Sequence, residues 1–149
     1  MARQYTGTAG KITNCQVAVS VSLVTETASC PVDWRLFVPE SWDAASSAAT
    51  PETGERRRRA GMPADAGHRE KWRLGLEMID EATGWCGKPP LVVADAGYGG
   101  SGAFRRGLAA RAPLWAVGIP RTQRVYSAAV KLSWPAAQGT GRPRRHGGP

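Results

Sequence analysis

The most constraining feature of the sequence is the apolar run Leu91–Ala94, which ends on Asp95 and is followed by a glycine-rich stretch. The run lacks the alternation of a strand with one wet face, so it predicts a strand covered on both faces, as in parallel or mixed sheets. An acid placed directly after such a strand lies where α/β sheets bind their ligands. Asp95 is also the last carboxylate of the chain.

Charge is distributed unevenly on the two sides of this acid. Residues 1–95 carry 11 Lys/Arg against 12 Asp/Glu, whereas residues 96–149 carry 9 Lys/Arg and no acid. A basic half without acids indicates a polyanionic partner, most simply nucleic acid, and a solvated basic tail is the alternative. The arginines considered for DNA contact are Arg56, Arg57, Arg58, Arg59, Arg121, Arg124, Arg142, Arg144 and Arg145.

Period-two alternation predicts two strands near the N-terminus, over residues 15–24 and 32–38. The short link between them favours an antiparallel hairpin. Residues 40–67, which include the run of four arginines, have no periodicity and are predicted to form an exposed loop. A run of arginines can bind phosphates, although most such runs are simply exposed to solvent.

The second part of the chain alternates helices and strands. Apolar residues follow helical spacing over residues 68–83, and Gly84 is the expected helix stop. After the strand that ends at Asp95, Ser101 is expected to cap a helix that ends near Arg111, and residues 114–119 read as a last strand. The whole is an α/β pattern with a mixed sheet, comprising a domain over residues 1–119 and a basic, irregular tail over residues 120–149.

Cysteine and histidine usage argues against other kinds of site. The three cysteines are odd in number and far apart, which favours reduced thiols in the cytosol over a metal site or disulfide. The two histidines are too few for a histidine-built metal site. No apolar stretch approaches the ~20 residues of a membrane span, and the N-terminus lacks the apolar centre of a signal peptide.

Asp95 itself allows two interpretations. Its carboxylate is the kind of hard oxygen ligand that Mg²⁺ prefers, and Ala96, Gly97, Gly99 and Gly100 would let the backbone approach a bulky substrate. Alternatively, Asp95 caps the following turn and the glycines serve its geometry. A phosphate-cradling loop is a weaker reading, because no Gly-Lys-Ser/Thr sequence follows.

Four ordered blocks, Ala2–Val17, Asp33–Trp42, Arg69–Trp72 and Val92–Gly99, together resemble bacterial insertion-sequence transposases of the DDE superfamily. The resemblance runs from Ala2 to about Gly118. It implies an RNase H-like fold in which two Asp and one Glu hold two Mg²⁺ (or Mn²⁺) ions for cleavage and strand transfer of DNA. It also implies element ends and target DNA as partners, a homo-oligomer for the intact protein and a location on the bacterial nucleoid in the cytoplasm.

In this resemblance Asp95 matches the second carboxylate of the family. The first belongs to a central strand upstream of the first block, between the strands over 15–24 and 91–95, and the third to a helix further downstream. The resemblance therefore predicts an internal fragment with an incomplete sheet, unpaired strand edges and no activity of its own. A non-catalytic DNA-binding or regulatory remnant and a small metal- or nucleotide-binding domain are the alternatives.

Overall fold

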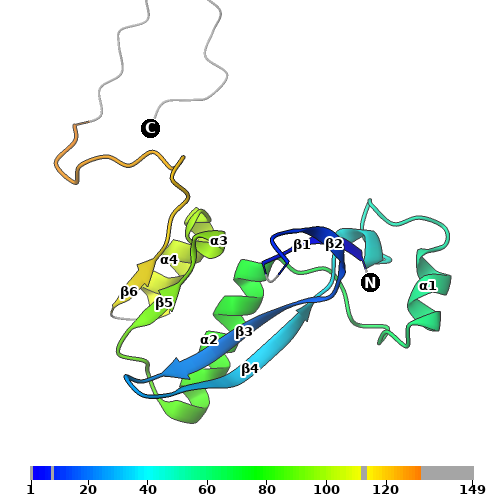
Figure 1. The fold of residues 1–149 in the computed structure, drawn as a ribbon, viewed down its shortest axis with the longest axis horizontal. Coiled ribbons are helices and arrows are strands. Elements are labelled where there is room, and N and C mark those ends of the chain that lie inside the picture. The colour runs from blue at the N-terminus through cyan, green and yellow to red at the C-terminus, as the bar shows by residue number, and fades with distance from the viewer. Residues whose placement is uncertain (1, 8, 112–113, 132–149) are drawn as a thin grey trace, which may run out of the picture.

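Short strand pairs and one long helix make up the structure (Figure 1). The computed structural model describes residues 2–7, 9–111 and 114–131. In chain order the strands are β1 Ala2–Thr6, β2 Lys11–Cys15, β3 Val17–Val24, β4 Ser29–Phe37, β5 Val92–Ala94 and β6 Trp115–Val117. The helices are η1 Glu40–Trp42, α1 Thr53–Arg59, α2 Lys71–Cys86, α3 Ala96–Gly99 and α4 Gly102–Arg111. The α/β class predicted from the sequence is confirmed.

The strands pair two by two. β1 pairs with β2 and β3 with β4 in antiparallel fashion, and β5 pairs with β6 in parallel. Among the described residues no sheet has a third strand, so the predicted mixed sheet is present only as separate pairs. In that part of the chain β3 and β5 each have one edge without a strand partner.

The predicted hairpin is confirmed as β3 and β4. Its inner face is buried against α2, where Val19 is 3% exposed. On the opposite face Ser20 lies beside Trp34, which is 62% exposed. Strand β3 begins at Val17 and not at residue 15 as predicted, because Cys15 belongs to β2. The first hairpin, β1–β2, was not predicted from the periodicity of the sequence. Gly10 closes that hairpin with a φ of 61°, a conformation that favours glycine.

Helix α2 holds the two parts of the core together. Leu74 and Met78, four residues apart, face β3 and pack around Val19. Leu76 and Ile79 face α4, where they meet its buried side chains Phe104 and Leu108, and the partly buried Val21, Val92 and Ala94 pack on the same cluster. Burial of a side chain such as Met78 or Leu108 contributes roughly 1.5–3 kcal/mol. The β3–β4 and β5–β6 pairs are therefore joined through α2.

The end of α2 lies beyond its expected stop. Gly84 stands inside the helix, which runs on to Cys86. Gly87 ends it with a φ of 81°, and its backbone N–H donates to the carbonyl of Thr83 at 3.0 Å. The prediction of Gly84 as the stop is wrong, because a glycine ends a helix only where the backbone turns to positive φ.

The segment 40–67, predicted to be an exposed loop, has regular structure and a buried side chain. It contains η1 and α1, and the Arg57 side chain inside it is only 7% exposed. The Arg57 guanidinium donates to the carbonyls of Trp42 at 2.6 Å, Pro63 at 2.9 Å and Ala66 at 2.6 Å. The segment is ordered by hydrogen bonds between polar side chains, among them Arg57 and Asp43, and the backbone, and such bonds leave no apolar periodicity to detect.

Strand β5 was expected to be covered on both faces, and this prediction is wrong. Val92 and Ala94 pack on the core, but Val93 is 70% exposed. The capping prediction for α4 is correct, since the Ser101 hydroxyl accepts from the Phe104 N–H at 3.2 Å.

After β6 the described residues 118–131 form no helix or strand, and residues 120–131 are all exposed. In the described part of the chain no helix has the length and apolar character needed to cross a membrane.

Candidate functional site

Asp95 stands at the carboxyl end of β5 and is the N-cap of α3. Its Oδ1 accepts a hydrogen bond from the Gly97 N–H at 2.9 Å. The residue is exposed, and no described residue hydrogen-bonds Oδ2. Both interpretations of Asp95 thus remain open, because one oxygen caps the turn while the other is free to bind a ligand.

Two of the glycines near Asp95 pack against each other. A Cβ on Gly99 would lie 1.8 Å from the carbonyl oxygen of Gly118, and a Cβ on Gly118 would lie 2.9 Å from the Ala96 nitrogen. The Gly118 N–H donates to the Ala94 carbonyl at 2.9 Å. Gly99 is buried in this contact, so it serves packing of α3 on β6 rather than the approach of a substrate.

The other acids near the core are engaged elsewhere. Glu81 pairs with Arg35 at 2.6 Å and Asp80 pairs with Arg111 at 2.7 Å. Among the described residues no group of three or more His, Cys, Asp or Glu side chains is placed to hold a metal ion. A single exposed carboxylate does not fit the octahedral oxygen set that Mg²⁺ demands, so these residues alone do not form the implied two-metal site.

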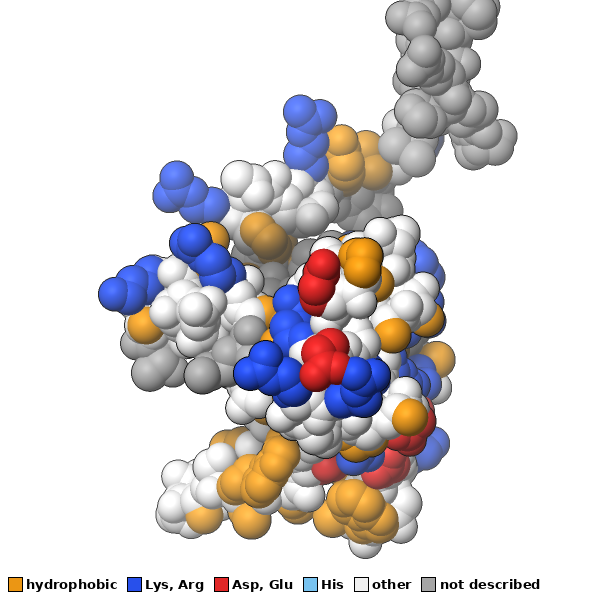
Figure 2. All heavy atoms as spheres, turned by 90° about the vertical axis from the view of Figure 1, so that its right-hand side faces the viewer, with side chains coloured by type: hydrophobic (Ala, Val, Ile, Leu, Met, Phe, Trp, Pro, Cys, Tyr) orange, Lys and Arg blue, Asp and Glu red, His pale blue; other side chains and the backbone are white. Residues whose placement is uncertain are grey.

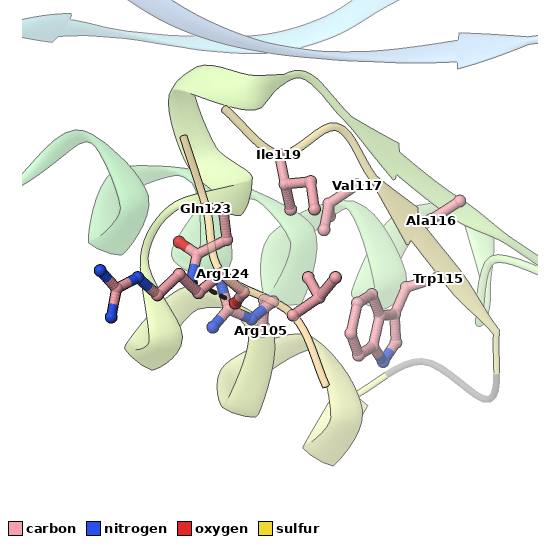
Figure 3. Close-up of a pocket in the computed structure, with 8 residues that line it drawn as sticks. Arg105, Trp115, Ala116, Val117, Ile119, Gln123 and Arg124 are labelled. Carbon is pink, nitrogen blue, oxygen red and sulfur yellow. Dashed lines mark hydrogen bonds between the residues drawn. The ribbon is translucent and has the colours of Figure 1, made fainter. Parts of the chain in front are cut away.

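A cavity of about 420 Å³ lies between α4, β6 and the irregular segment that follows β6 (Figure 3). Arg105 comes from α4, and its guanidinium donates to the carbonyl of Gly99 in α3. Trp115, 36% exposed, forms another wall. The lining is Arg105, Trp115–Val117, Ile119, Gln123, Arg124 and Val125. Two arginines and an aromatic side chain therefore line one hollow.

Sequence reasoning selected Arg124 but not Arg105 or Trp115. Arg105 precedes Arg106 in a helix whose inward residues are Phe104 and Leu108, and only the fold shows which arginine turns to the cavity. Arg121 is exposed on the same irregular segment as Arg124. Arg142, Arg144 and Arg145 lie outside the described residues.

The four arginines of α1 have four different environments. Arg57 is buried among carbonyls, as described above. Arg56 donates to the Ser41 carbonyl and stacks on the Trp42 ring, 4.5 Å from its centroid. Arg58 pairs with Glu55, and Arg59 ends the helix in an exposed position. Figure 2 faces this end of the molecule and shows basic and acidic side chains adjoining there.

An acid at the carboxyl end of a strand lies where α/β sheets bind their ligands, and arginines are side chains that bind phosphate. Over residues 1–149 the sequence matches the family model described as DDE superfamily endonuclease, and the chain belongs to this family. The predicted resemblance to a DDE-superfamily, transposase-like protein is confirmed. Enzymes of this superfamily generally use divalent metal ions and act on DNA. The chain matches no curated protein and no solved structure.

Proposed function

We propose that the chain takes part in transposase-type processing of DNA, with Asp95 as one carboxylate of the divalent-metal site. The observation that carries this proposal is the position of Asp95, exposed at the carboxyl end of β5 with Oδ2 free of described partners. Carboxylate oxygens suit Mg²⁺ and Mn²⁺. The other ligands of such a site would come from carboxylates that the described residues do not bring to Asp95.

On its own the chain is expected neither to cut nor to join DNA. Catalysis at paired metal ions requires several carboxylates around the scissile phosphate. The full sequence has no acid after Asp95, and the described acids before it form no group of three or more that could hold a metal ion. The chain therefore contributes to such a site the strands and helices that position Asp95, one carboxylate and a basic surface.

The test is a cleavage and strand-transfer assay with the purified chain, Mg²⁺ or Mn²⁺, and DNA carrying the ends of the element. Asp95→Asn is the matched control, since asparagine retains the N-cap of α3. We expect equal background from both proteins. Cleavage by the wild type that Asp95→Asn abolishes would contradict inactivity and would show that Asp95 is required for catalysis.

A second candidate is DNA binding without catalysis, in the nucleoid and directed to element ends or target DNA. It is favoured by residues 96–149, which carry 9 Lys/Arg and no acid. Each neutralised phosphate contributes about −0.9 to the slope of log K against log salt for duplex DNA. A titration of duplex DNA over a range of salt is expected to give a steep slope, and absent or salt-independent binding would exclude this function.

A further inference from the structure

We propose that the cavity between α4 and β6 holds one unpaired nucleotide of a DNA strand, with its base on Trp115 and its phosphate between Arg105 and Arg124. This inference rests on the proposed action on DNA and adds a specific subsite to it. Neither Trp115 nor Arg105 stands out in the sequence.

The size of the cavity suits a ligand of this kind. Its volume of about 420 Å³ lies within the roughly 300–1,000 Å³ of typical small-ligand sites. The second cavity, between the β1–β2 hairpin and the segment after α1, has about 230 Å³ and falls below that range. A nucleotide is a ligand of intermediate size with an aromatic face and a charged end, and the first cavity offers a surface for each.

The walls are divided in the same way. Trp115 and the apolar side chains of Val117 and Ile119 stand on one side in Figure 3, and the guanidinium groups of Arg105 and Arg124 stand on the other. Any of the four bases can stack on an exposed tryptophan, and arginine binds phosphate through the planar set of donors of its guanidinium. A bare anion would use only the arginines, so the aromatic wall favours a nucleotide.

Among the described residues neither Arg105 nor Arg124 forms an ion pair with an acid. Arg105 uses one nitrogen on the Gly99 carbonyl, and this bond to an uncharged group fixes the direction of the side chain. Arg111, on the same helix, is instead neutralised by Asp80 at 2.7 Å. Because no acid lies after Asp95, phosphate is a fitting counter-charge for Arg105 and Arg124.

The position of the cavity explains why the nucleotide should be unpaired. Through Gly99 the Arg105 side chain is tied to α3, the helix that Asp95 caps. A base reaches the Trp115 wall only when it is not stacked in a duplex, since both faces of a paired base are covered by its neighbours. The cavity thus selects strand ends and distorted sites over intact duplex.

The experiment compares binding of the full chain to three DNAs by fluorescence anisotropy: a blunt duplex, the same duplex with a short single-stranded overhang, and that overhang with abasic sites. We expect the overhang to bind about 5- to 150-fold tighter than the other two, the equivalent of ~1–3 kcal/mol for one stacked base. Trp115→Ala should remove the preference and Trp115→Phe should retain most of it. Trp34→Ala, which removes an exposed tryptophan on β4, is the matched control and should change nothing.

Arginine variants supply a second readout. Arg124→Ala should weaken binding of the overhang more than of the blunt duplex, whereas Arg106→Ala, on the exposed side of α4, should weaken both equally. A deoxynucleoside monophosphate is the further arm. If it binds as tightly as the overhang, the site takes free nucleotides and the DNA assignment is overturned.

The failures are distinguishable. Equal binding of all three DNAs, with normal salt dependence, overturns the nucleotide subsite and leaves DNA binding intact. Absence of binding to every DNA overturns both.

Discussion

Two arginine-rich regions of the molecule differ in what their side chains contact. In and around α1, Arg56, Arg57 and Arg58 are bound to carbonyls, an aromatic ring and a glutamate of the same segment. Beyond Asp95, Arg121 and Arg124 are exposed on a stretch without acids, and Arg105 is held by a single carbonyl at the edge of a cavity. The denser run of arginines is thus the less available one.

The comparison indicates that the number of arginines in a segment is a poor guide to phosphate binding. The contacts that each guanidinium already makes are a better one. A guanidinium that already donates to three carbonyls has few donors left and would leave those carbonyls unpaired if it moved. Of residues 56–59, Arg59 is therefore the best candidate for a contact with DNA. In the C-terminal half the best candidates are Arg121 and Arg124.

The largest expected effect comes from Arg57. Arg57→Met keeps the aliphatic stem but removes three charge-assisted hydrogen bonds, and should lower the free energy of unfolding by roughly 3 kcal/mol. Denaturant unfolding measures this, with Arg59→Met as the control, expected to stay within about 0.5 kcal/mol. An unchanged stability together with lost DNA affinity would place Arg57 on the DNA after all.

A second contrast concerns salt dependence. Replacing Arg121 and Arg124 together by alanine should reduce the steepness of the log K against log salt plot by about 1.8 for duplex DNA, if each meets one phosphate. The same double change at Arg56 and Arg58 should leave the slope nearly unchanged, because a carbonyl and a carboxylate already bind them. Equal losses from the two pairs would remove the distinction between the regions.

The pH dependence of the 40–67 segment follows from Asp43. Hydrogen bonds from the backbone N–H groups of Ala45 and then His68 hold the pKa of the Asp43 carboxyl below its usual range. The stabilisation is complete above the unfolded pKa of about 3.9 and is lost as the pH falls through the lowered folded pKa. The protection of the segment against hydrogen exchange, relative to the intrinsic exchange rate at each pH, should therefore fall at acid pH, and Asp43→Asn should remove most of that dependence. A wild-type profile that is flat through this window would show that Asp43 does not hold the segment.

The smallest effect is expected at Asp95. Without bound metal its carboxylate repels any phosphate that passes nearby, by about 1 kcal/mol at 4 Å in water. Asp95→Asn should therefore tighten DNA binding by about 2- to 5-fold in the presence of a chelator. An unchanged affinity would mean that DNA bound to the C-terminal half does not approach Asp95.

The sequence predicted those helices and strands that bury apolar side chains at regular spacing on one face. The alternation from Val17 onward gave the β3–β4 hairpin, and the apolar spacing that includes Leu76 and Ile79 gave α2. The same reasoning failed where single polar contacts decide the structure. Arg57 orders its segment through carbonyls that have no side-chain signature.

For the candidate site, the sequence identified the acid but not the cavity. Asp95 was recognisable because it ends an apolar run. Arg105 and Trp115 are ten residues apart on different elements, and their meeting depends on the way α4 packs beside β6. The exposure of Val93 was likewise unpredictable, since coverage of a strand depends on neighbours that the run of residues 91–94 does not encode.

The contact between Gly99 and Gly118 limits how this site can evolve. With a Cβ on Gly99 only 1.8 Å from the facing carbonyl, any other residue at this position forces α3 and β6 apart. Side-chain changes therefore have no gradual way to alter the spacing between Asp95 and the cavity. A different spacing would require the insertion or deletion of backbone residues, so we expect homologues that keep this fold to have glycine at both positions.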